Sequence, residues 1–238
     1  VLFLLPWHGH TLVGTTDNPA PLEADPRPRE EDVEYVLRHV REYCELPVER
    51  GDVLAAWSGL RPLVEDGGAG ATARLSRDHV ILTSPSGLVT VTGGKWTTYR
   101  SMAEDAVDAA VAVGELRPER GCVTRDLPLV GAARFSPDGH ARLRSLYGLP
   151  GDVALHLNRA YGDRAEAVAR LARDGLGERL AAGHPYVEAE VVYARDHELA
   201  CTADDVLARR LRLSFLDEAA AESARPRVEE LLARQGTA

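Results

Sequence analysis

The spacing of hydrophobic residues changes along the chain and divides it into two parts. Up to residue 121, short apolar runs typical of strands alternate with two stretches of helical period. From residue 122 onward the strand-like runs disappear, and apolar residues recur every three or four positions. The pattern therefore predicts an α+β part over residues 1–121, followed by an all-α domain over residues 122–238.

Two hairpins are predicted in the first part. Their strands are apolar runs on either side of a turn that contains Gly or Pro, and they cover residues 1–5 with 11–16, and 80–83 with 88–92. Helical spacing covers Glu30–Cys44 and residues 97–113, and Gly114 closes the second of these helices. A further strand is expected over residues 53–64, interrupted at Ser58-Gly59.

Six helices are predicted in the second part. They cover about residues 138–147, 152–161, 163–174, 186–198, 203–216 and 225–234. Thr202 and Asp205 have the spacing of a capping box, which would open the fifth helix.

Composition excludes several classes of protein. A net charge of −9 argues against a nucleic-acid-binding surface, which needs clustered basic residues. No apolar run approaches the ~20 residues of a membrane span. The three cysteines lie far apart, which fits a reducing cytoplasm and neither a zinc site nor a disulfide framework. Since the chain starts at Val1 and its one methionine is Met102, we expect a fragment of a longer protein.

Lys95 is the single lysine of the chain, against 27 arginines. It follows Gly93-Gly94 and precedes Thr97-Thr98, between a predicted strand and a predicted helix. Lysine carries a compact charge on a flexible stem, whereas arginine carries a planar fork. Paired glycines before a helix N-terminus make a seat for an anion or for the electron-rich edge of a flavin. A plain tight turn is the competing interpretation.

Arg61 and Arg77 are the candidate partners of Lys95. Arg61 is held between Leu60 and Pro62, and Arg77 stands just before a predicted strand. Two arginines and a lysine that converge would suit a phosphate or carboxylate. The competing interpretations are a structural salt bridge for Arg61 and a surface pair with Asp78 for Arg77.

Two other patterns carry no prediction of a site. The run Gly68–Ala73 fits the letters of a dinucleotide-binding fingerprint but lacks the expected βαβ context. His8 and His10 have a spacing that a metal ion could use, but no third ligand is near them in the sequence. No metal site is therefore predicted.

Taken in order, the motifs resemble the FAD-dependent, quinone-linked glycerol-3-phosphate dehydrogenases. The matching segments are Pro6-Trp7, Gly14–Asp17, Ser58–Leu63, Ser76–His79, Gly93–Arg100, Met102–Glu104, Glu188–Glu198 and Asp205–Leu213. This resemblance implies a Rossmann-like FAD domain, a substrate domain with a large antiparallel sheet, and a helical C-terminal domain. Residues 1–121 would belong to the first two domains and residues 122–238 to the third.

The resemblance also implies roles for individual residues. Arg61, Arg77 and Lys95 would bind glycerol 3-phosphate, and Lys95 and Arg61 would act in catalysis. The residues that would contact FAD are Gly93, Gly94, Lys95, Thr97 and Thr98. Glycerol 3-phosphate would be oxidised to dihydroxyacetone phosphate, with hydride passing to FAD and electrons then passing to membrane quinone.

The start of the chain departs from the family, because the glycine-rich ADP-binding fingerprint is absent. We therefore expect the C-terminal half of such an enzyme, inactive without its N-terminal FAD-binding half, located in the cytoplasm and peripherally associated with the cytoplasmic membrane. A homodimer is one assembly that the sequence leaves open. Three alternatives stay open: an oxygen-reducing oxidase of the same fold, a non-catalytic helical interaction module, and a phosphate-binding regulatory domain.

Overall fold

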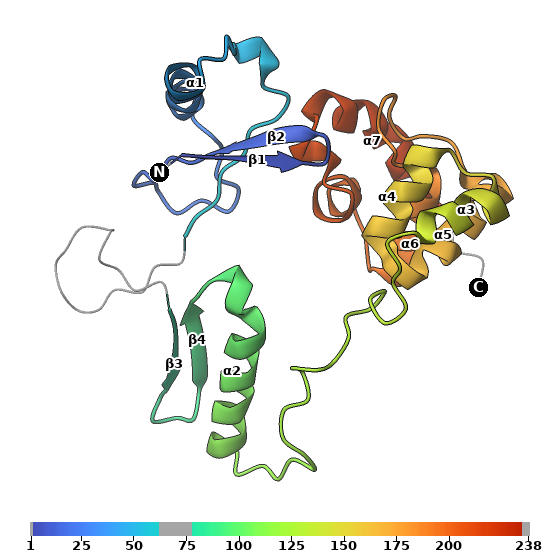
Figure 1. Cartoon of the computed structure of the whole chain (residues 1–238). Coiled ribbons are helices and arrows are strands. Elements are labelled where there is room, and N and C mark those ends of the chain that lie inside the picture. The colour runs from blue at the N-terminus through green and yellow to red at the C-terminus, as the bar shows by residue number, and fades with distance from the viewer. Residues whose placement is uncertain (1, 62–77, 235–238) are drawn as a thin grey trace. The chain divides into compact units, whose positions relative to one another are not determined.

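The computed structural model describes residues 2–61 and 78–234, and it forms two compact units (Figure 1). The first unit combines Val1–Gly59 with Leu129–Ala238, and the second unit consists of Leu60–Pro128. In the described ranges every strand lies before residue 94, while residues 122–234 contain helices and one isolated bridge. The predicted α+β part followed by a helical part is confirmed.

The first unit begins with an antiparallel hairpin of β1 (Phe3–Trp7) and β2 (His10–Gly14). Its turn is formed by His8 and Gly9, whose φ angles are 48° and 82°. Helix α1 follows at Glu30–Cys44, with the bounds that its amphipathic spacing predicts. Both predictions are confirmed.

The helices of the second half of the chain all lie in the first unit. They are α3 (Gly139–Tyr147), α4 (Gly151–Tyr161), η4 (Gly162–Arg164), α5 (Ala165–Leu171), η5 (Ala172–Leu176), α6 (Glu188–His197), η6 (Asp205–Arg210), η7 (Leu213–Phe215) and α7 (Glu218–Ala233).

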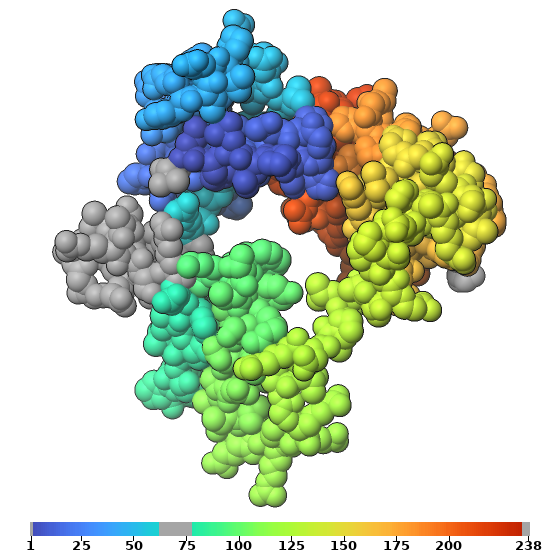
Figure 2. Space-filling model, viewed as in Figure 1, coloured from blue at the N-terminus to red at the C-terminus, as the bar shows by residue number. Residues whose placement is uncertain are grey.

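Two apolar clusters hold these helices together. One contains Leu157 and Val168, from α4 and α5, and the other contains Leu207 and Val228, from η6 and α7. All four side chains are fully buried. Trp7, at the end of β1, packs against the second cluster, and Figure 2 shows this hairpin in contact with the C-terminal helices. The β1–β2 hairpin thus contacts the helical core through Trp7.

Two predicted helices differ from the structure. The prediction over 203–216 breaks at Arg212, which adopts a left-handed conformation with φ of 61°. The prediction over 225–234 begins too late, because Asp217 caps α7 by accepting a hydrogen bond from the backbone N–H of Ala220 at 2.9 Å. Pro226 then lies inside the helix, where it has no N–H to donate to the carbonyl four residues earlier.

The predicted strand over 53–64 is wrong for its described part. Residues 53–61 form neither strand nor helix. Instead, the carbonyl of Leu54 accepts a hydrogen bond from the backbone N–H of Glu218, and the ring of Trp57 packs on Phe215. This segment therefore makes its hydrogen bond and its aromatic contact with the C-terminal helices and does not pair in a sheet.

The second unit contains the other predicted hairpin and its helix. Strands β3 (His79–Thr83) and β4 (Val89–Gly93) pair antiparallel, and a short helix η3 (Trp96–Thr98) leads into α2 (Tyr99–Val113). Helix α2 contacts both strands. Its C-terminal end is closed by the N–H of Gly114, which donates to Ala110. The predictions for this unit are confirmed.

Candidate functional site

The predicted flavin-side residues lie in one sharp turn between β4 and η3. Gly93 and Gly94 have φ angles of 76° and 86°, a backbone region that favours glycine. Lys95 returns to extended geometry and immediately precedes the first helical residue, Trp96. The chain therefore reverses within two residues and presents Lys95 at the start of a helix.

Gly94 is required by the packing of α2 against the hairpin. A Cβ atom at this position would lie 2.5 Å from Sδ of Met102 and 3.1 Å from Cβ of His79. The His79 ring is itself tied to α2, since its Nε2 lies 2.8 Å from the Asp105 carboxylate. These contacts fix the turn relative to the helix that follows it.

The ammonium group of Lys95 has no hydrogen bond or ion pair within residues 2–61 and 78–234. Its backbone is held instead: the carbonyl of Lys95 accepts hydrogen bonds from the N–H and the hydroxyl of Thr98, both at 3.0 Å. Lys95, Thr97 and Thr98 are exposed, and no acidic residue occupies the first turn of α2. The turn thus offers a cation, two hydroxyl groups and a helix N-terminus to solvent.

The predicted substrate residues are described in part. Arg61 is exposed and belongs to the same unit as Lys95. Arg77 and the run Gly68–Ala73 lie outside the described residues. The structure therefore brings together the five residues from Gly93 to Thr98 that were predicted at the flavin.

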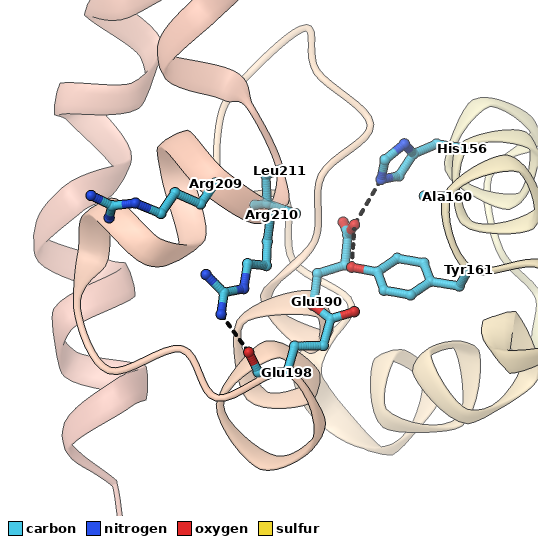
Figure 3. A pocket seen from close by; sticks show the side chains of 8 residues that line it. All are labelled: His156, Ala160, Tyr161, Glu190, Glu198, Arg209, Arg210 and Leu211. Carbon is cyan, nitrogen blue, oxygen red and sulfur yellow. Dashed lines mark hydrogen bonds and ion pairs between the residues drawn. The ribbon is translucent and has the colours of Figure 1, made fainter. Parts of the chain in front are cut away.

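A second polar site, which sequence reasoning missed, is a pocket of about 400 Å³ in the first unit (Figure 3). Its lining residues are His156, Ala160, Tyr161, Glu190, Glu198, Arg209, Arg210 and Leu211. Glu190 is fully buried at its base. One of its oxygens lies 2.7 Å from Nε2 of His156 and accepts from the Tyr161 hydroxyl at 3.1 Å. The other accepts from the N–H of Val187 at 2.8 Å.

Glu190 is therefore a structural acid that ties α4 to α6. The signal in the sequence is that it shares the inward face of α6 with Val187, Val191 and Ala194, where an acid needs internal partners. Burial, and then the charge of Glu190, raise the pKa of Tyr161 well above its usual range, so this hydroxyl keeps its proton.

The rim of the pocket carries charged groups with internal partners. Arg210 donates to the backbone carbonyl of Glu198, and Arg209 donates to Asp205 at 3.2 Å. The pKa of Asp205 is lowered to about 2, first by the N–H of Cys201 and then by the hydroxyl and N–H of Thr202. The Thr202 hydroxyl also accepts from the N–H of Asp205 at 3.2 Å, which confirms the predicted capping box.

No group of three or more His, Cys, Asp or Glu residues in the described ranges could hold a metal ion. The ring of His10 stacks on His184 with centroids 6.2 Å apart, and burial together with the charge of His156 lowers the pKa of His8. Within the same ranges, no helix combines the length and apolar character that a bilayer crossing requires.

Known proteins and protein families match nearly the whole chain. Residues 1–100 match the family of FAD dependent oxidoreductases, and residues 122–236 match the C-terminal domain of alpha-glycerophosphate oxidase. A mitochondrial glycerol-3-phosphate dehydrogenase of Arabidopsis thaliana is 47% identical, over 99% of this chain and 40% of its own length. The mitochondrial glycerol-3-phosphate dehydrogenase of Homo sapiens is 49% identical, over 99% of this chain and 33% of its own length.

A solved structure agrees with these relatives. The glycerol-3-phosphate dehydrogenase from Bacillus halodurans, complexed with FAD, superposes with a TM-score of 0.76 at 27% identity, over 98% of this chain and 47% of that one. The chain thus spans roughly a third to a half of the length of the relatives that it matches. Because two family models match successive parts of the chain and its relatives align over nearly all of it, residues 1–100 belong to the FAD dependent oxidoreductases and residues 122–236 to the C-terminal domain of alpha-glycerophosphate oxidase.

Proposed function

We propose that this chain is part of an FAD-dependent enzyme that oxidises sn-glycerol 3-phosphate to dihydroxyacetone phosphate. The observation that carries the proposal is the ammonium of Lys95, which has no partner among the described residues and is presented by the Gly93-Gly94 turn, in a chain 47–49% identical to glycerol-3-phosphate dehydrogenases. We place the division between the substrate- and FAD-binding part and the helical domain at residues 121 and 122.

The residues of the turn fit a flavin. Left-handed glycines leave the backbone open to close approach, and a helix N-terminus without acidic residues favours an electron-rich group. Gly93, Gly94, Lys95, Thr97 and Thr98 would hold this edge of the cofactor. When bound, FAD supplies the acceptor for a hydride from C2 of the substrate. We infer that the ADP-binding half of the FAD site comes from sequence outside this chain.

The arginines would anchor the substrate away from the reacting carbon. Arg61 and Arg77 would bind the phosphate oxygens, because a guanidinium fork matches a phosphate in a bidentate way. Binding energy from the phosphate then orients C2. Lys95 would stabilise negative charge as the C2 hydroxyl loses its proton, which is the role of a fixed cation in an acyl or alkoxide site. The general base is not among the residues assigned here.

Membrane quinone is the electron acceptor that we propose, with the enzyme in the cytoplasm and bound peripherally to the membrane. A homodimer is the proposed assembly. Oxygen is the second candidate acceptor, since the C-terminal domain matches a family described from an oxidase. Oxygen uptake with stoichiometric peroxide on addition of glycerol 3-phosphate would assign oxygen, and reduction of a soluble quinone without oxygen uptake would assign quinone.

The proposal is tested by anaerobic addition of glycerol 3-phosphate to the full-length protein that contains this chain, while the flavin absorbance is followed. We expect rapid bleaching in the parent protein. In Lys95→Ala the bleaching rate should fall by about 10²–10³-fold, the usual loss when a charge-stabilising group is removed. Arg120→Ala is the matched control, because it removes an exposed cation of the same unit.

Each outcome has one meaning. Unchanged bleaching in Lys95→Ala would remove Lys95 from the mechanism. A flavin that does not bleach in the parent protein would exclude glycerol 3-phosphate as the substrate. A colourless full-length protein that does not take up added FAD would exclude the cofactor.

A further inference from the structure

We propose that the turn of the β1–β2 hairpin forms a pH-sensitive contact with the C-terminal helices. The turn is docked on the helices while His8 is neutral, and it is released when His8 takes up a proton. All the groups involved belong to the first unit, so this contact does not depend on the proposed function.

The residues on either side of His8 dock the turn. Trp7 packs against the apolar cluster of the C-terminal helices. The ring of His10 lies parallel to that of His184, with centroids 6.2 Å apart and an interplanar angle of 7°. Nδ1 of His10 also donates to the carbonyl of His8 at 3.1 Å, which closes the turn. His8 is therefore held at the contact by both of its flanking residues.

On the helical side, each histidine of the contact has a carboxylate partner. His184 stacks on Tyr186 with centroids 6.1 Å apart, and Tyr186 meets the ring of His156 edge-to-face at 4.8 Å. Nε2 of His184 lies 3.4 Å from the Asp217 carboxylate, and Nε2 of His156 lies 2.7 Å from that of Glu190. A proton on either ring therefore meets a negative charge.

Asp217 also acts on the hairpin. Its pKa is lowered first by the N–H of Ala220 and then by His184, and the charge of His10 contributes as well. His10 and His184 thus share one carboxylate across the contact. This leaves His8 as the histidine of the turn that has no acid beside it among residues 2–61 and 78–234.

The surroundings of His8 are cationic. Its ring has no hydrogen bond or ion pair in the part of the chain that the structure describes. Partial burial, and then the charges of His156, Arg212, Arg159 and His10, lower the pKa of His8. Arg159 and Arg212 form no ion pair with a described acid, so their charges are not neutralised. A proton on His8 is therefore repelled by three different parts of the chain.

The direction of the response follows from this lowered pKa. Above the ordinary pKa of 6.5, His8 is neutral whether the turn is docked or released, and docking keeps its full stability. As the pH falls from 6.5 through the lowered pKa of the docked state, that stability is lost, because only the released turn binds the proton readily. His156 and His184 keep their carboxylate partners, so acid should release the turn and leave the helices in place.

Hydrogen exchange followed by mass spectrometry tests this contact in the full-length protein that contains the chain. It is measured at about pH 7.5 and about pH 5.5, on either side of the ordinary titration of histidine. After correction for intrinsic exchange, residues 3–14 should lose protection severalfold in acid, while α1 should change little. His8→Asn should abolish that loss, because asparagine is neutral and tolerates the φ of 48° at this position.

A fixed charge supplies the second comparison. His8→Lys should show low protection of residues 3–14 at both pH values. His8→Met is its matched partner, since it has a similar length without charge, and it should stay protected at both. His39→Asn removes a histidine of α1 in the same unit, and it should keep the acid response of the parent protein.

Three results would overturn the proposal. The first is a parent protein whose protection at residues 3–14 is the same at the two pH values. The second is an acid response in His8→Asn as large as that of the parent protein. The third is equal protection in His8→Lys and His8→Met, which would show that charge at this position does not matter.

Discussion

The two units differ in how their structure is stabilised. The helical part of the first unit buries apolar side chains completely, among them Leu157, Val168 and Leu207. None of the described residues of the second unit is buried to that degree, and its order comes from hairpin pairing, the Gly94–Met102 contact and surface ion pairs. The candidate catalytic residue Lys95 lies in the second unit, where no described side chain is fully buried.

This comparison predicts whether a substitution should change stability or function. In the helical part, most of the free energy of unfolding comes from burial, so truncation costs stability. In the second unit, exposed side chains carry little stability, so their replacement should appear in function first. Four predictions test that division.

The largest loss of stability is expected from Glu190→Ala. The His156 ring, the Tyr161 hydroxyl and the Val187 N–H would lose their common acceptor, and each buried unsatisfied donor costs roughly 1–3 kcal/mol. Urea unfolding followed by circular dichroism should show a loss of at least about 3 kcal/mol. Glu198→Ala in the same pocket is the control, because burial raises the pKa of Glu198 and no group of residues 2–61 or 78–234 donates a hydrogen bond to its carboxylate. Equal losses in the two variants would contradict the structural role of Glu190.

Next in size is the contrast between Leu157→Ala and Val107→Ala. Leu157 is fully buried, and its truncation should lower the free energy of unfolding by about 2–5 kcal/mol. Val107, on α2, is 60% exposed, and its truncation should cost less than about 0.5 kcal/mol. Chemical denaturation of both variants measures the two losses in the free energy of unfolding, and similar losses would contradict the difference between the two units.

A smaller, local effect is expected from Gly94→Ala. The new Cβ would meet the Met102 sulfur at 2.5 Å, and a φ of 86° is strained for alanine, so we expect a loss of about 1–3 kcal/mol. In a Met102→Ala background the closest steric contact disappears, while the 3.1 Å approach to Cβ of His79 and the backbone part stay. Hydrogen exchange of β3, β4 and α2 should report the difference. An identical effect in both backgrounds would show that Met102 does not press on the turn.

The smallest effect concerns acid stability at Asp205. Its pKa is lowered from 3.8 to about 2 in the fold, so the stability that it contributes is complete above pH 3.8 and is lost as the pH falls from 3.8 through about 2. Asp205→Asn should unfold more readily at neutral pH and show a shallower decline over that window. Thermal unfolding at a series of pH values measures both, and parallel declines would exclude Asp205 as the titrating group.

Much of the fold follows from local sequence patterns. Both hairpins and the bounds of α1 follow from turn glycines and amphipathic spacing, which act over a few residues. The break at Arg212 falls on a residue other than glycine, so the sequence does not predict it. Pro226 lies inside α7 and suggests a later helix start than the one at the cap residue Asp217. Both depend on tertiary contacts that spacing does not record.

The candidate site divides in the same way. The turn at Lys95 could be predicted because an unusual residue, two glycines and a helix start are adjacent in the sequence. The roles of Lys95, Arg61 and Arg77 stay predictions. The cluster around Glu190 joins residues from α4 and α6 that are 29 and 34 positions apart, and the sequence shows no sign of that contact beyond an acid on an apolar face.

The split of the first unit has a consequence for biosynthesis. Trp7 and Trp57 leave the ribosome long before Phe215, the ring against which Trp57 packs. At about 5–20 residues per second, the wait between Trp57 and Phe215 is roughly 10–30 s. During that interval the two indole rings lack the C-terminal residues against which they pack, and all of Leu60–Pro128 is made in between. Until the last helices are made, these uncovered rings make the nascent chain prone to aggregation.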